Sequence, residues 1–164
     1  MVKIGLLSDT HAYIDDSIIK FMEPVDQIWH AGDVGNVKVL EQLQLFKPVT
    51  AVYGNIDDHL LRSELPEFVS FKVEGVQVLM THIGGYPGKY TPGIKKLLLE
   101  HKPQLFVSGH SHILKVQFDK QLQCLHMNPG AAGISGFHQF RTMLRFTIDN
   151  TQIKDLEVWE LPRK

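Results

Sequence analysis

The feature that most constrains the fold of this chain is a unit repeated in its first half: a short apolar run, a polar turn and a helical segment. Residues 2–7 form a nearly continuous apolar run, which is typical of a strand covered on both faces. Residues 27–30 and 49–52 form two more runs, and helices are predicted between them over 15–22 and 36–46. This alternation predicts a largely parallel sheet with connecting helices.

The second half has a different pattern, because its strand-like runs come in pairs joined by short turns. The pairs are 68–73 with 76–80, 113–118 with 122–126, and 143–148 with 153–159. Each pair predicts an antiparallel hairpin. A helix is expected through about Lys102, with Thr91 as its N-cap and Pro92 as its first residue, followed by a strand at 105–107. Both halves fit an α/β fold of two packed β-sheets flanked by helices, as a single domain over 1–164.

Polar residues of the metal-ligand type follow five of these apolar runs. They are Asp9, His11, Asp33, Asn55, His82, His110 and His112. Side chains beyond the carboxyl ends of buried strands commonly form α/β active sites. Oxygen and imidazole ligands without a thiolate favour manganese, iron, nickel or zinc over calcium or magnesium. Seven ligands are too many for one tetrahedral ion, but they suit two ions that share a carboxylate.

Each of these residues, taken singly, is more often an ordinary turn or surface residue. The joint pattern is what indicates a site with two metals. In an extended segment, residues two apart point to the same side, so His110 and His112 are expected to present their imidazoles together.

The composition argues against several other classes of protein. The formal net charge of -1, from 17 basic and 18 acidic residues, gives no support for nucleic-acid binding. Cys124 is the only cysteine, which excludes an intramolecular disulfide and fits a reducing compartment. The N-terminus lacks a signal-peptide layout, and no apolar run reaches membrane-spanning length. We therefore expect a cytoplasmic, soluble protein without membrane contact.

The order of the motifs resembles the signature of the calcineurin-like metallophosphoesterases. The motifs are Asp9-Thr10-His11, Gly32-Asp33, Gly54-Asn55-Ile56-Asp57, His82 and Gly109-His110-Ser111-His112. The short chain and Asn128-Pro129-Gly130 are similar to the small YfcE-like phosphodiesterase branch. The resemblance covers the chain from Val2 to beyond Gly130. It implies a four-layer α/β/β/α sandwich and hydrolysis of phosphoesters, in particular of small phosphodiesters.

The resemblance also implies a role for each ligand. One ion would be held by Asp9, His11 and His112, and the other by Asn55, His82 and His110. Asp33 would bridge the two ions together with a hydroxide that attacks phosphorus in line, so Asp33 and Asn55 are the expected catalytic residues. Manganese is the first expectation for both ions, with nickel, iron and zinc left open. No other cofactor is expected.

One position departs from the pattern of the wider superfamily. Many members have a histidine directly after the asparagine, and it protonates the leaving group. Ile56 occupies that position here and has no proton to give, a feature common in the small branch. His59 and His138 are the alternative proton donors, and Asp57 is expected to stabilise a turn or to support a ligand.

Several nearby residues have open interpretations. The glycine-rich segment 84–90 lacks the Walker pattern and is expected to be a substrate-contact loop or a lid. Lys89 and Arg141 either contact phosphate or are solvated surface charges, the second being the safer prediction. His30 is expected to pack near the site, where it would orient Asp33.

Two other functions compete with hydrolysis. The branch also resembles the small subunit of the eukaryotic retromer coat, in which the same fold is a binding scaffold. A scaffold is expected to have lost ligands, whereas this chain has every one. A nuclease would need a basic groove, which the near-neutral charge does not suggest. The relatives also imply a homodimer or a homotetramer.

Overall fold

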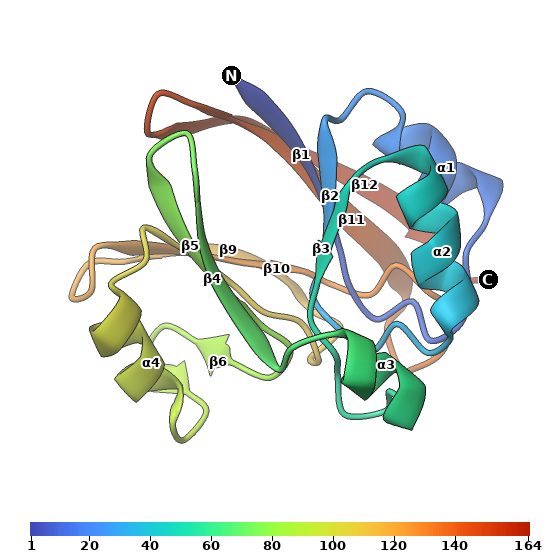
Figure 1. Ribbon diagram of the computed structural model, residues 1–164, viewed down its shortest axis with the longest axis horizontal. Coiled ribbons are helices and arrows are strands. Elements are labelled where there is room, and N and C mark those ends of the chain that lie inside the picture. Colours follow the sequence, from blue (N-terminus) through green and yellow to red (C-terminus); the bar gives the residue numbers. More distant parts are fainter.

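The structure is a computed structural model that describes residues 1–164, and it contains two five-stranded sheets packed face to face (Figure 1). The first sheet has the order β12-β11-β1-β2-β3. Its strands are β1 (Val2–Leu7), β2 (Gln27–His30), β3 (Val49–Ala51), β11 (Phe140–Asp149) and β12 (Gln152–Pro162). β1, β2 and β3 are parallel, whereas the hairpin β11–β12 adds antiparallel strands beside β1.

The second sheet has the order β4-β5-β8-β10-β9. Its strands are β4 (Phe68–Val73), β5 (Val76–Thr81), β8 (Leu105–Val107), β9 (Leu114–Asp119) and β10 (Cys124–Pro129). The three central strands β5, β8 and β10 are parallel, and the edge strands β4 and β9 are antiparallel to their neighbours. The three predicted hairpins are therefore present.

Helices cover the outer faces of both sheets. α1 (Asp16–Met22) and α2 (Val37–Phe46) lie on the first sheet, α4 (Ile94–His101) lies on the second, and α3 (His59–Glu64) follows β3 (Figure 1). Asn36 caps α2 as predicted, because its side chain accepts from the Lys38 N–H at 2.8 Å. The predicted α/β fold of two packed sheets flanked by helices is confirmed. None of the four helices has the length and apolar character needed to cross a membrane.

Three apolar clusters hold the layers together. The largest lies between the sheets and includes Ile4, Trp29 and Phe146 from the first sheet and Val78 from the second. A second cluster joins the first sheet to α1 and α2, and a third joins the second sheet to α4. β1 shows why its run is apolar throughout: Ile4 faces the other sheet, whereas Leu7 faces the helices.

Three expectations about local structure were wrong or incomplete. α4 begins at Ile94, because Gly93 has a φ of 90° and occupies the N-cap position; Thr91 is not the cap. α3 was not predicted, because it has only six residues, of which Leu61 alone is buried. The segment 84–90 forms the small hairpin β6 (Gly85–Tyr86) and β7 (Lys89–Tyr90).

Candidate metal centre

The seven predicted ligands all lie just beyond the carboxyl ends of strands β1, β2, β3, β5 and β8. The structure brings six of them into two groups, in each of which the ligand atoms lie within 4.8 Å of one another. The first group is Asp9, His11 and His112, and the second group is Asp33, His82 and His110. We call these six residues and Asn55 the metal cluster. The resemblance divides the four histidines in the same way, but it places Asn55 in the second group and Asp33 between the two groups; ligation itself stays a prediction.

Asp33 belongs to the second group and also faces the first. Its Oδ2 is 3.4 Å from His11 Nε2 of the first group and 3.2 Å from His82 Nε2 of the second. Asp9 has the corresponding place in the first group, with Oδ1 3.2 Å from His112 Nε2 and 3.9 Å from His82 Nε2. A carboxylate that faces imidazoles of both groups is suited to be shared by two cations.

Asn55 lies on the outer side of the second group. Its Oδ1 accepts a hydrogen bond from His110 Nδ1 at 3.0 Å, and both residues are exposed. His82, by contrast, is only 3% exposed. The second group is therefore open to solvent on the side of Asn55 and closed on the side of His82.

The donor atoms fit a bound cation. Asp9 Oδ1, His11 Nε2 and His82 Nε2 are buried and have no hydrogen-bond partner. Buried polar atoms without a partner are rare in folded proteins, and a cation would satisfy all three. Mixed carboxylate and imidazole donors are suitable for manganese, iron, nickel or zinc.

The pKa shifts of the cluster residues also indicate a site for a cation. The neighbouring carboxylate of Asp33, and then that of Asp9, raise the pKa of His11 to about 9. Burial lowers the pKa of His82, but Asp33 and Asp9 outweigh burial and raise it. Burial raises the pKa of both carboxyl groups, yet the surrounding histidines hold it well below its usual range. The cluster thus favours positive charge between its carboxylates.

Fixed hydrogen bonds orient the ligands. His82 Nδ1 donates to the Ala31 carbonyl at 2.7 Å, which leaves Nε2 facing Asp33. Asp9 Oδ2 accepts from the Ser8 hydroxyl at 2.6 Å and from the His110 N–H at 3.1 Å. Asp33 Oδ1 accepts from the Ile56 N–H at 3.0 Å. Such supporting bonds fix the tautomer and direction of metal ligands.

Two glycines of the motifs allow the close approach of neighbouring segments. A Cβ at Gly54 would collide with the side chain and main chain of Asp33. A Cβ at Gly109 would collide with the Ser8 hydroxyl and lie 2.9 Å from Asp9 Oδ2. Glycine at both positions is therefore a packing requirement of the cluster.

The main chain at the cluster is unusual. Asp9, His11, Asp33, His110 and His112 have φ angles between 46° and 71°, in the left-handed region that non-glycine residues seldom adopt. The sequence predicts an extended segment around His110 and His112. The left-handed φ angles show that the segment is not extended. The two imidazoles point to different groups, because left-handed residues turn the chain between them.

His138 supports the first group, a role that the sequence does not indicate. Its Nε2 donates to the Gly133 carbonyl at 2.8 Å, so its Nδ1 accepts from His112 Nδ1 at 3.2 Å. His112 Nε2 is thereby left facing Asp9. With both nitrogens engaged, His138 is not a free proton donor. His59 is exposed at the start of α3, and its role as a proton donor stays a prediction.

Other predicted neighbours have structural roles. Asp57 accepts from the N–H groups of Val34, Gly35 and Gly54, so it stabilises the turn, as expected. The hydrogen bonds of His30 go to residues other than Asp33: its Nδ1 accepts from the Gly32 N–H, and its Nε2 donates to Thr10 Oγ1. Burial lowers the pKa of His30 to about 4, in agreement with this neutral ring.

The sequence leaves the roles of Arg141 and Lys89 open, and the structure places these two residues in different surroundings. Arg141 is neither a phosphate contact nor a surface charge, because it is 3% exposed and pairs with Asp15 at 2.9 Å. Its Nε also donates to the Ala132 carbonyl, and Ala132 N–H donates to the carbonyl of Ser8. Arg141 therefore braces the chain beside β1. Lys89 is exposed on β7 and remains a surface charge.

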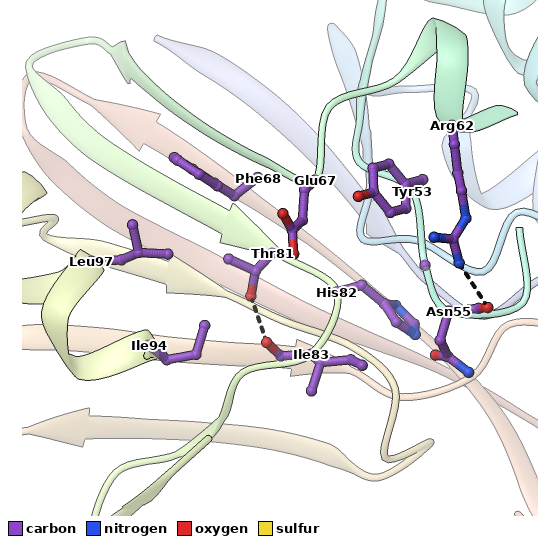
Figure 2. A pocket seen from close by; sticks show the side chains of 11 residues that line it. Tyr53, Asn55, Arg62, Glu67, Phe68, Thr81, His82, Ile83, Ile94 and Leu97 are labelled. Carbon is purple, nitrogen blue, oxygen red and sulfur yellow. Dashed lines mark hydrogen bonds between the residues drawn. The ribbon is translucent and has the colours of Figure 1, made fainter. Parts of the chain in front are cut away.

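A cavity of about 330 Å³ adjoins Asn55 and His82, as Figure 2 shows. Its wall is mainly apolar and includes Phe68, Ile83 and Leu97. The arginine in this wall, Arg62, is already engaged: its Nη2 donates to the Asn55 carbonyl at 3.0 Å and its Nε to the Asp57 carbonyl at 2.8 Å. Arg62 thus holds the turn that carries Asn55.

Comparisons with known proteins agree with this site. The family profile of the calcineurin-like phosphoesterase superfamily domain matches residues 2–151. A probable metallophosphoesterase of Methanothermobacter thermautotrophicus is 32% identical over 134 residues, covering 78% of this chain and 76% of the relative.

Solved structures show the same fold at lower sequence identity. An archaeal phosphodiesterase superposes with a TM-score of 0.74 at 20% identity, over 96% of this chain and 99% of the other. Vps29 from Entamoeba histolytica, complexed with zinc, superposes with a TM-score of 0.75 at 13% identity, over 99% of each chain. At these identities the likeness extends to the fold alone.

Proposed function

Because this chain belongs to the calcineurin-like phosphoesterase superfamily, we propose that it is a phosphodiesterase that depends on two divalent metal ions at the strand ends. The observation that carries the proposal is the position of Asp33 between the two groups of ligands. Its Oδ2 lies within 3.4 Å of an imidazole nitrogen from each group.

In this proposal the first group holds one ion, the second group with Asn55 holds the other, and Asp33 is shared. Manganese is the ion that we propose, with nickel, iron and zinc as alternatives to be tested. When bound, such ions lower the pKa of water towards neutrality and neutralise the charge on phosphoryl oxygens.

The residues of the chain orient the substrate and exclude water. Asn55 and His110 form the exposed side of the cluster, so the substrate phosphate approaches there. His82 and Asp9 form the buried side, where little water competes with electrostatic interactions. Ile56 lies beside Asn55 with its side chain 45% exposed and supplies no proton. We therefore expect diesters whose leaving groups depart without protonation to react fastest.

The competing proposal is a non-enzymatic scaffold, in keeping with the similarity to Vps29. The complete ligand set and its buried atoms without partners support the enzyme instead. Binding of metal alone would not separate the two proposals, whereas turnover would.

The test is hydrolysis of bis-p-nitrophenyl phosphate and p-nitrophenyl phosphate by chelator-treated protein, before and after addition of manganese. We expect metal-dependent turnover of the diester that exceeds turnover of the monoester. Nitrophenolate leaves without a proton, so the lack of a proton donor at Ile56 should not limit the rate of hydrolysis. No turnover with manganese, nickel, iron or zinc, in protein with an unchanged circular dichroism spectrum, would favour the scaffold.

A further inference from the structure

The cavity of about 330 Å³ beside the metal cluster shares two residues with it, Asn55 and His82. The segments that carry these residues form part of its wall, and β4 and α4 complete the wall with Phe68 and Leu97 (Figure 2). We call it the Phe68 cavity. Small-molecule sites begin near about 300 Å³. The Phe68 cavity is therefore large enough for one ester group of a substrate whose phosphate lies at the cluster.

Large hydrophobic side chains of the wall are exposed. Phe68 and Ile83 are 37% and 39% exposed, and they line the cavity together with Ile94 and Leu97 (Figure 2). Exposed apolar side chains that gather beside a polar site commonly mark a binding surface. Covering them with an apolar group releases water from both surfaces and is favourable.

The polar groups of the wall offer a ligand few free partners. The Thr81 hydroxyl donates to the Ile83 carbonyl at 3.3 Å (Figure 2). Arg62 donates to two main-chain carbonyls, and its guanidinium lies 4.9 Å from the centre of the Tyr53 ring. The half-buried Tyr53 hydroxyl and the exposed Glu67 carboxylate have no partner in the protein and are accessible to water. No buried polar atom of the wall outside the cluster therefore needs a ligand.

The charges of the wall favour a neutral group. Apart from the cluster residues, Arg62 and Glu67 are its only ionised side chains, so their formal charges cancel. A second anionic group would lose its hydration and find Arg62 already engaged. An amine could pair with Glu67, but ion pairs on exposed residues contribute little.

We propose that the Phe68 cavity binds one ester group of the phosphodiester, and that this group is a neutral hydrocarbon about the size of a phenyl ring. The inference rests on the proposed function, because the phosphate must lie at the metal cluster for its ester group to enter the cavity. A sugar or a polyol would lose hydrogen bonds to water and would gain few on Phe68, Ile83 and Leu97.

Three phosphate monoesters test this proposal as competitive inhibitors of bis-p-nitrophenyl phosphate hydrolysis by manganese-loaded protein. 2-Phenylethyl phosphate and the phosphate of diethylene glycol monoethyl ether have the same charge and the same number of non-hydrogen atoms, but they differ in polarity. Ethyl phosphate lacks the distal group. We expect 2-phenylethyl phosphate to inhibit at an about tenfold lower concentration than either of the others, an effect that partial burial of a phenyl ring supplies.

Three variants make the result specific. Leu97→Gln makes the wall polar without a poor helix former in α4, and it should lower the ratio of inhibition constants by about twofold to threefold. Phe68→Gln should have the same effect from β4. Leu99→Gln is the matched control, because Leu99 lies on α4 outside the cavity wall and is 55% exposed, so the full ratio should remain. A wild-type ratio near one, or a ratio unchanged in both wall variants, would overturn the proposal.

Binding of the free alcohols separates this proposal from the proposed function. 2-Phenylethanol has no phosphate, so its binding to chelator-treated protein requires no metal. The methyl resonances of Leu97 and Leu99, assigned by their loss in the two glutamine variants, are followed by NMR. 2-Phenylethanol should shift those of Leu97 saturably and leave those of Leu99 in place, whereas diethylene glycol monoethyl ether should shift neither.

The two experiments together decide among three outcomes. If no diester is hydrolysed but the Leu97 methyls shift, the phosphodiesterase fails and the apolar site stands. If diesters are hydrolysed with equal inhibition constants and no shift, the Phe68 cavity holds only water and its proposal fails. A shift with equal inhibition constants would mean that the ester group of the substrate does not enter the cavity, which would also overturn the proposal.

Discussion

The metal cluster and the surroundings of His126 on β10 both contain buried polar atoms without partners, but they shift the pKa of histidine in opposite directions. In the metal cluster, the carboxylates of Asp9 and Asp33 raise the pKa of His11 and His82. No carboxylate pairs with His126, and burial lowers its pKa to about 4. One residue type therefore occupies two buried environments with opposite effects on its pKa.

The difference shows that neighbours, more than burial, decide which ligand a buried histidine suits. His82 and His126 are 3% and 1% exposed, so their accessibility hardly differs. Carboxylates beside His82 make its surroundings attractive to a cation. A neutral ring such as His126 suits a neutral hydrogen-bonding group.

The largest expected effect comes from removing the shared carboxylate. Asp33→Ala should abolish binding of both metal ions and lower kcat/KM on the order of a thousandfold or more, because several kcal/mol of charge stabilisation are lost. Asn55→Ala should weaken only one ion. Metal content per chain, measured after gel filtration, distinguishes the two results.

The control for this prediction is Asp149→Ala, which removes a half-buried carboxylate paired with Lys154 at 3.0 Å. It should leave metal content unchanged. Two ions and full activity in Asp33→Ala would refute the shared position of this residue.

A smaller effect is expected at the histidine that fixes the tautomer of His112. His138→Phe should lower the affinity of one of the two ions by about 10- to 100-fold, the usual effect of losing a bond to a metal ligand. Calorimetric titration should show one weakened site and one unchanged site. His59→Phe, on the exposed start of α3, is the control, and equal weakening of both sites in His138→Phe would contradict the assignment to the first group.

The pH dependence of stability tests the neutral state of His126. Its folded pKa is depressed, so it costs no stability above the unfolded value near 6.5, and stability falls as pH drops from about 6.5 to about 4. His126→Phe should therefore lose less stability than wild type between pH 7.5 and pH 5, by up to about 2 kcal/mol.

Urea unfolding of chelator-treated protein at the two pH values measures this difference. Parallel losses in both proteins would mean that the pKa of His126 is the same in the folded and unfolded states. The contrast between His82 and His126 would then disappear.

The smallest effect concerns Lys115 on β9. Lys115→Met removes the contact of its ammonium with the ring of Tyr86 and should lower the free energy of unfolding by about 0.5–1 kcal/mol. Metal content should not change, because Lys115 lies outside the metal cluster. A loss of bound metal in this variant would show that Lys115 supports the metal cluster.

Much of this structure is predictable from the sequence because hydrophobic patterning dominates it. The run at residues 2–7 becomes β1, and Asn36 caps α2, since buried strands and helix caps leave strong local signals. The helix α3 leaves almost none, because Leu61 is its only buried residue. The start of α4 is set by the left-handed Gly93, where a simple capping rule indicated Thr91.

The candidate site also has a part that the sequence predicts and a part that it does not. The positions of the ligands follow from strand ends, which the sequence marks clearly. The support of His112 by His138 depends on a contact between segments 26 residues apart, and the partnerless nitrogens of His126 depend on packing around β10. Contacts of this kind have no periodicity and no local motif, so only the folded structure reveals them.

The left-handed backbone at five of the seven cluster residues has an evolutionary consequence. Each such residue costs on the order of 1 kcal/mol or more relative to glycine, which adopts this conformation freely. In a lineage released from selection for metal binding, a substitution of His112 by glycine would relieve backbone strain while it removed a ligand. Decay of the centre would then be favoured by stability and hard to reverse, so an intact set of seven is a sign of continuing selection.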